Sequence, residues 1–319
     1  MYKSEEHSLI EDVWNRWNDI CTTKFNRMKA NEEFINKRFI EIYDLDKELS
    51  PDVPDDNISI KKADVEDDIK ALISYAVGCM FGRYTLEKPG IYFAGGEWEN
   101  NTHIFTPDED NIIPITDEEY FSDDIVGLFV KWVEIVFGDN NLEANLDYIA
   151  KALPNKGNSA REVIRNYFLN DFYKDHCNMY SVSGSGKRPI YWLFDSGKQN
   201  GFKCLVYLHR YNKDTVGLIR SDYLSKTQNV IENSMKNADY VISSTSSAVD
   251  RAQATKKRDK YIKQLNELKT YYQALSHVAL QRIELDLNDG VKANYDKFQN
   301  IEILNESGKK QIINLLAKI

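Results

Sequence analysis

Polar side chains of the kinds that hydrogen-bond to nucleic-acid bases gather between positions 187 and 200. Lys187 and Arg188 open this segment, and Lys198, Gln199 and Asn200 follow one another near its middle. Lysine and arginine favour the edge of guanine, whereas glutamine and asparagine favour the edge of adenine. These residue types make the segment a candidate for base contact, and ordinary solvated surface is the alternative for each residue.

Four further cations follow within the next twenty or so positions, namely Lys203, Arg210, Lys213 and Arg220. Isolated cations of this kind suit phosphate groups, which position a protein on DNA without reading its sequence. Ordinary solvated surface charge remains the alternative for each of these residues, because exposed lysine and arginine are common in all proteins.

The rest of the sequence lacks the residue patterns of a catalytic or metal site. None of the five histidines stands with a second ligand at the spacing of a metal site. Asp175, His176 and Cys177 come closest to a nucleophile with its base, but neighbouring residues on a helix point about 100° apart. The glycine-rich, Walker and nucleophile-elbow motifs are also missing. We therefore expect no catalytic, cofactor-binding or metal-binding residue in this chain.

Two pairs of acidic residues and one pair of glycines have simple structural interpretations. Asp108 with Asp110, and Asp123 with Asp124, fit a solvated loop and the start of a helix. The glycines within residues 94–98 are not followed by the lysine and hydroxyl of a phosphate-binding loop. They predict a tight turn.

Two runs of aromatic and β-branched residues flank the loop that carries Lys198, and this pattern predicts a β-hairpin over residues 189–209. A two-stranded ribbon with basic ends can enter the major groove of DNA. The other interpretation is a half-buried sheet inside the protein. The sequence leaves both open.

Most of the remaining chain shows the apolar spacing of helices. Apolar periodicity and capping residues predict helices over residues 5–45, 64–81, 117–138, 142–153, 159–176 and 212–224. Residues 225–283 predict one or two long polar helices, with a bend at the hydroxyl-rich stretch 243–247. After residues 289–290 we expect a loop followed by a short C-terminal helix.

These elements predict a predominantly α-helical α+β protein. We expect a helical spacer over 1–89, a mixed connector over 90–157, and a small basic target-recognition region with the hairpin over 158–224. A long C-terminal helical hairpin and tail would occupy 225–319.

The net charge of −9 is unevenly distributed. Residues 1–150 carry a net −19, residues 151–226 carry +7, and residues 227–319 carry +3. The middle segment would attract a polyanion, although uneven surface charge alone also explains the pattern. No signal peptide, membrane span or paired cysteine pattern is evident, so the sequence predicts a cytoplasmic protein.

Several motifs together resemble the C-terminal part of the PglX family, the adenine-specific DNA methyltransferases of type 1 BREX phage-defence systems. Related regions occur in fused restriction–modification enzymes. The motifs lie at residues 75–84, 94–98, 108–115, 161–168, 174–177, 187–194 and 283–291.

The resemblance implies a role in a reaction whose catalyst lies elsewhere. Members of the family transfer a methyl group from S-adenosylmethionine to adenine N6 with an Asn/Asp-Pro-Pro-Tyr/Phe motif. This chain has seven prolines, none of them adjacent, so no catalytic or cofactor residue carries over. The implied function is DNA recognition and spacing, with double-stranded DNA as partner. The alternative is a module that docks other BREX subunits or a phage protein that imitates DNA.

Overall fold

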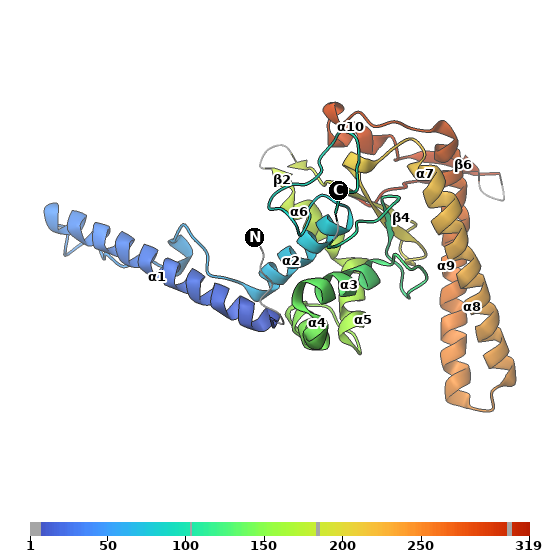
Figure 1. Cartoon of the computed structure of the whole chain (residues 1–319), viewed down its shortest axis with the longest axis horizontal. Coiled ribbons are helices and arrows are strands. Elements are labelled where there is room, and N and C mark those ends of the chain that lie inside the picture. The colour runs from blue at the N-terminus through green and yellow to red at the C-terminus, as the bar shows by residue number, and fades with distance from the viewer. Residues whose placement is uncertain (1–7, 103, 183–185, 305–307) are drawn as a thin grey trace.

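The computed structural model describes residues 8–102, 104–182, 186–304 and 308–319. Figure 1 shows a central body from which two helical extensions project in different directions. Helix α1 (Ile10–Ile42) forms one extension, and the paired helices α8 (Ser225–Ser244) and α9 (Ala248–Gln281) form the other. The predicted fold class, a predominantly helical α+β protein, is confirmed.

The central body contains shorter helices and three small sheets, joined by irregular segments. The helices are α2 (Val65–Met80), α3 (Ile125–Phe137), α4 (Leu142–Ala152), α5 (Ala160–Asn170), α6 (Phe172–Met179), α7 (Thr215–Leu218) and α10 (Val291–Asp296). The strands are β1 (Ile112–Pro114), β2 (Ser181–Val182), β3 (Gly186–Lys187), β4 (Tyr191–Asp195), β5 (Lys203–Tyr207), β6 (Ile301–Leu304) and β7 (Lys310–Ile313). Single helical turns occur at Asp55–Asn57, Asp139–Asn141, Leu208–Arg210 and Leu287–Asp289, and a π-helical turn at Ile219–Leu224 leads into α8.

The predicted hairpin is present as β4 and β5, and it lies at the centre of the body. The two strands pair antiparallel with Leu193 opposite Leu205, and β1 adds to the other edge of β5. Successive side chains of a strand point to opposite faces. Leu193 and Leu205 enter one hydrophobic cluster, while Trp192 and Phe194 enter another and are fully buried. The strands are therefore covered on both faces, and the interpretation of the hairpin as a ribbon that enters a DNA groove is wrong.

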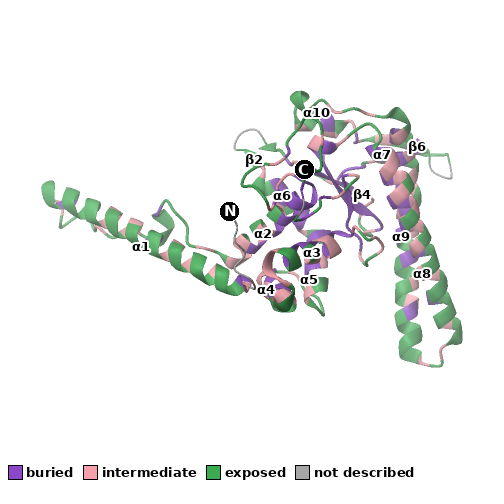
Figure 2. Cartoon of the chain, in the orientation of Figure 1, coloured by how far each residue is buried: buried purple, intermediate pink, exposed green. Residues whose placement is uncertain are grey.

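The two clusters occupy opposite sides of this sheet. The first contains residues of the five helices α2, α3, α4, α5 and α6, together with loop residues such as Phe93 and Phe105. The second joins α7, the root of the α8–α9 pair, and the C-terminal segment. Figure 2 shows the buried residues concentrated around β4 and the surfaces of both extensions largely exposed. The first cluster crosses the expected boundaries at 89 and 157, so the proposed division into segments stays a functional prediction.

Helix caps explain where several helices begin. Asp64 accepts a hydrogen bond from Asp67 N, and Ser159 accepts one from Glu162 N, as the capping patterns predict. The prediction that a helix begins at residue 117 is wrong. Asp124 caps Val126 N and Gly127 N instead, so α3 begins at Ile125.

The C-terminal helical hairpin is confirmed, with its turn at Thr245–Ser247. The Ser247 hydroxyl accepts a hydrogen bond from Asp250 N and so caps α9. A helix of 34 residues is about 50 Å long, so α9 extends well beyond the body. The β6–β7 hairpin was not expected from the sequence.

Candidate nucleic-acid interface

The nine residues predicted to contact DNA fall into separate parts of the structure. Lys187 and Arg188 are exposed on and next to the small β2–β3 sheet. Figure 1 shows that sheet on the other side of the body from α9. These two residues therefore do not adjoin the loop that carries Lys198.

Lys203 and Arg210 are structural, and their assignment to DNA phosphates is not supported by their positions. Lys203 is 8% exposed; its Nζ donates to Leu169 O at 2.9 Å and lies 3.6 Å from Asp195 Oδ2. Arg210 is 9% exposed and donates to the carbonyls of Phe81 and Glu109 at 3.3 and 2.8 Å. Buried cations already satisfied in this way are not available to a duplex. Neither Lys203 nor Arg210 belongs to the candidate interface.

The loop between β4 and β5 presents Lys198, Gln199 and Asn200, and the Glu267 carboxylate of α9 holds its backbone against that helix. Glu267 accepts from Ser196 Oγ at 2.7 Å, from Gln199 N at 2.8 Å and from Gly201 N at 3.2 Å. Lys198 and Gln199 extend into solvent from this anchored backbone. Base-contacting groups are more precise when such a network holds the backbone beneath them.

Two glycines allow the loop to approach α9 closely. A Cβ at Gly197 would lie 2.7 Å from Glu267 Oε2, and one at Gly201 would lie 3.0 Å from Leu268 Cδ2. Gly197 also has φ +134°, a conformation that favours glycine. Asn200 has φ +52°, so the turn itself accounts for asparagine there, and its base contact stays a prediction.

A basic strip on α9 continues outward from the anchored loop. Helix α9 carries seven lysines and arginines against three acidic residues. Lys256, Lys260 and Lys263 recur at spacings of four and three, and Glu267 follows four residues later. This spacing places them on the face of α9 that contacts the loop. Lys260 is already paired with Asp117 of the body, which leaves Lys256 and Lys263 exposed.

Sequence reasoning missed this strip. The sequence predicts residues 225–283 only as long polar helices and places every candidate DNA contact between residues 187 and 220. The available signal was the charge of α9 together with the spacing of its lysines on one face.

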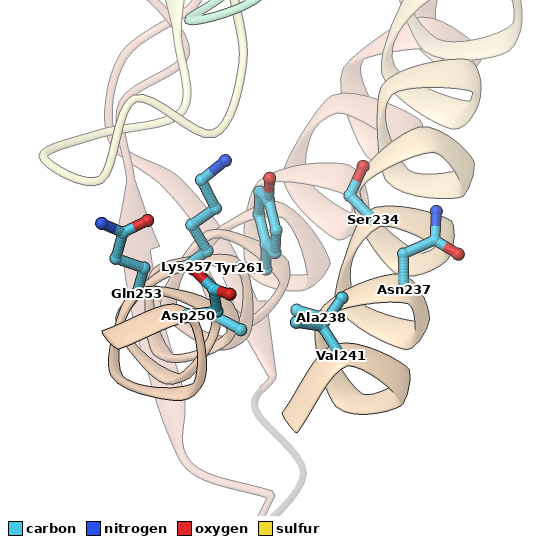
Figure 3. Close-up of a pocket in the computed structure, with 9 residues that line it drawn as sticks. Ser234, Asn237, Ala238, Val241, Asp250, Gln253, Lys257 and Tyr261 are labelled. Atoms are coloured by element: carbon cyan, nitrogen blue, oxygen red, sulfur yellow. The ribbon is translucent and has the colours of Figure 1, made fainter. Parts of the chain in front are cut away.

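An open groove lies between α8 and α9, beyond the loop contact. It has a volume of about 360 Å³ and is lined by small and polar side chains. Figure 3 shows Lys257 and Gln253 on the α9 side, and Ser234 and Asn237 on the α8 side. The groove contains one lysine and one carboxylate, from Asp250, and no arrangement for chemistry.

Lys213 and Arg220 share a second hollow with Arg282, near the C-terminal end of α9. This hollow has a volume of about 270 Å³, and Arg282 pairs there with Asp214 at 2.7 Å. Arg220 Nε is buried and has no hydrogen-bond partner among the described residues. The three cations form a second local basic surface, consistent with the predicted phosphate role of Lys213 and Arg220.

The acidic pairs are more buried than the sequence indicated. Asp124 is fully buried and accepts two hydrogen bonds from Arg165, at 2.8 Å each. Asp110 and Asp123 both lie within 2.8 Å of the Tyr223 hydroxyl, although one hydroxyl donates a single proton. The position of Asp124 at the start of a helix is confirmed, but none of these four carboxylates is fully exposed, so their interpretation as solvated residues is wrong.

The Asp175–Cys177 motif serves the core. The His176 ring is 1% exposed, and its Nε2 accepts from Ile190 N and Tyr191 N at 3.2 and 3.3 Å. Burial, with a smaller effect of the Arg83 charge, lowers the pKa of His176 to about 3. Burial also raises the pKa of the Cys177 thiol. A neutral histidine and a protonated thiol are not an activated nucleophile pair.

No group of three or more histidine, cysteine, aspartate or glutamate side chains within the described ranges is placed to hold a metal ion. No helix in that same part of the chain is both long and apolar enough to cross a membrane.

The anchor at Glu267 leads to a prediction. Glu267→Ala should speed hydrogen exchange at the Gln199 and Gly201 amides, because both lose their acceptor. We expect the free energy of unfolding to fall by about 1–3 kcal/mol, which is typical when partly buried donors lose a charged acceptor. Exchange read by mass spectrometry, with Glu232→Ala on the exposed surface of α8 as control, tests this. Unchanged exchange in residues 196–201 would contradict it.

The sequence is similar to two adenine-specific methyltransferases. PglX of Lacticaseibacillus casei (strain Zhang) is 41% identical over 301 residues, which cover 91% of this chain and 24% of the relative. BrxX of Escherichia coli O9:H4 (strain HS) is 40% identical over 253 residues, covering 74% of this chain and 20% of the relative. No protein-family model matches the chain.

The chain belongs to the family of PglX and BrxX, as a region homologous to part of those proteins. It spans only about a quarter or less of the length of the relatives. The resemblance seen in the sequence motifs is therefore confirmed, while the activity of the whole methyltransferase belongs to the proposal that follows.

Proposed function

We propose that this chain is the DNA-recognition and spacer region of an adenine-N6 DNA methyltransferase of a BREX phage-defence system. S-adenosylmethionine and the catalytic residues would lie in the remainder of the methyltransferase. Double-stranded DNA is the proposed partner, and the cytoplasm the proposed location.

One observation carries this proposal: the anchored loop with Lys198 and Gln199 adjoins the strip with Lys256 and Lys263. An acidic protein repels DNA at long range, so binding requires a local basic surface. The strip supplies phosphate contacts that position the duplex, and the loop supplies side chains of the types that read bases. An enzyme that extrudes its target base needs such a separate grip on the duplex.

The proposal predicts salt-dependent DNA binding that relies on the strip. Lys256→Glu with Lys263→Glu should weaken binding to a short duplex at least tenfold, because two phosphate contacts are lost and two repulsions appear. The slope of log affinity against log salt should fall by about 2, close to one for each contact. Fluorescence anisotropy of a labelled duplex, titrated from low to moderate salt, measures both quantities.

A matched control carries the same change in charge far from the strip. Lys24→Glu with Lys37→Glu alters two exposed lysines of α1 and should leave affinity within about twofold. Lys198→Glu should weaken binding and also change the preference among duplexes of different sequence. Absence of salt-dependent binding at low ionic strength, or equal losses in test and control, would refute the proposal.

The second hypothesis is docking of other BREX subunits or of a phage protein that imitates DNA. An imitator would be acidic and would bind the same strip, so the lysine substitutions would weaken it as well. Competition between such a protein and the labelled duplex would support a shared surface.

A further inference from the structure

Helix α1 is covered on one side by the chain segment that follows it. Phe25 and Ile40 are buried there, at 3% and 7% exposure. Lys29 Nζ pairs with Asp55 at 2.7 Å, and Asn36 Nδ2 donates to Pro51 O at 3.3 Å. At about 100° per residue, these positions share one face of the helix. Residues 51–58 therefore occupy that face.

The opposite side of α1 carries an exposed apolar stripe. Val13, Trp17, Ile20, Ile35 and Ile42 are 40–71% exposed. They fall within about a 60° arc at helical spacing. Phe34 and Phe39, exposed at 64% and 56%, lie at its edges. We call these seven residues the α1 stripe. Clustered exposure of large apolar side chains marks an interaction surface.

The charge of α1 narrows the class of partner. The helix carries six basic and six acidic residues, so it has no net charge. A helix that lies on an anionic membrane is typically rich in lysine and arginine around its apolar face. DNA contact likewise needs excess positive charge. A neutral helix with an apolar stripe suits another protein helix with an apolar face.

We propose that the α1 stripe docks a helix from the part of the methyltransferase outside the region matched here. This proposal rests on the proposed function, since it assigns the spacer helix its partner. The two relatives extend over about four times the matched length or more, so the family contains a large additional polypeptide that this region accompanies. Helix α1 projects away from the α8–α9 pair in Figure 1, which leaves the basic strip free while the stripe is covered.

Few contacts within this region stabilise helix α1. Only Ile10, Phe25 and Ile40 of the 33 residues of α1 are buried. A long helix with so few buried contacts gains most of its stability from packing of an amphipathic face. Docking of a second helix would remove Trp17 and Ile35 from water and supply that packing.

The test uses this chain together with the rest of the Lacticaseibacillus casei relative, co-expressed as a separate tagged polypeptide. Tag capture should retain this chain. Trp17→Glu with Ile35→Glu should reduce the retained amount at least tenfold, because charges enter the apolar contact. Asp12→Lys with Lys37→Glu, which alters exposed charges on another face, should be retained like the wild type.

Three further measurements decide between outcomes. Circular dichroism should show equal helicity in all variants, because every substituted side chain is exposed. Sedimentation should show a monomer for the chain alone; a dimer dissolved by Trp17→Glu with Ile35→Glu would overturn the proposal in favour of a second copy. Failure of capture, or equal capture of both double variants, would also overturn it. The variant with Trp17→Glu and Ile35→Glu should bind duplex DNA as the wild type does. If the wild-type chain is captured but binds no duplex DNA, only the proposed function is refuted.

Discussion

Replacing Arg165 by methionine should lower the free energy of unfolding by about 3–5 kcal/mol, the usual cost of leaving a buried charge without its partner. Arg165 donates through two nitrogens to Asp124, which is fully buried, and through one of them also to Thr116 O at 2.8 Å. The substitution keeps most of the apolar side chain and removes only the charge and its hydrogen bonds. Urea unfolding followed by tryptophan fluorescence measures the change.

Helix α5 offers a matched control one turn away. Arg161 makes an equally bidentate pair with Glu143, at 2.6 and 2.7 Å, but both side chains are largely exposed. Solvent and salt screen such a pair, so Arg161→Met should have a far smaller effect. Comparable losses in the two variants would show that burial of Asp124 does not set the strength of its pair.

Asp108→Asn should make the protein progressively more stable than the wild type as the pH rises from about 4 to 7. Burial raises the pKa of Asp108 to about 7, with further contributions from the nearby charges of Asp110 and Asp123. A carboxyl whose folded-state pKa is raised binds a proton in the folded state that the unfolded chain has released. Its stabilising contribution is complete below pH 4 and is lost as the pH approaches 7.

The expected gain of the variant over the wild type across this range is about 2–4 kcal/mol, from about 1.4 kcal/mol for each unit of pKa shift. Asparagine keeps the acceptor for Ile112 N, which Asp108 Oδ1 binds at 3.1 Å, so the loop should retain its shape. Thermal or urea unfolding at pH 5, 6, 7 and 8 gives the difference. Asp56→Asn, an exposed control, should show no such trend. A flat difference would mean that Asp108 titrates as an ordinary exposed carboxyl.

Local patterns in the sequence predicted the helices and the hairpin but not the burial of the hairpin. Apolar spacing and capping residues such as Asp64 and Ser159 act within a few positions, so they are visible in one sequence. Whether Trp192 and Phe194 face solvent or a core depends on α7, α9 and the C-terminal segment, which are distant along the chain. The signal for burial on both faces was the run Cys204–Tyr207 of β5, in which apolar residues follow one another without polar residues between them.

The candidate interface was predictable only in part for the same reason. The types of Lys198 and Gln199 indicated base contact, and the structure leaves them exposed. Lys203 and Arg210 are also cations of the kind that contact DNA, but both are buried. Their side chains donate to the carbonyls of Leu169, Phe81 and Glu109, which lie far away in sequence. The strip on α9 becomes recognisable once Glu267 shows which face of that helix meets the loop.

The central sheet has a consequence for how such a region can diversify. Strands β4 and β5 contribute alternate residues to the two hydrophobic clusters. Replacing the elements of either cluster by an unrelated module would therefore expose the strand face that the cluster covers. Under the proposed function, new DNA preferences would arise by point substitution at loop positions such as Lys198 and Gln199, whose exposed side chains do not contribute to the sheet. The buried core would stay unchanged while the seven-residue loop between β4 and β5 varies in sequence.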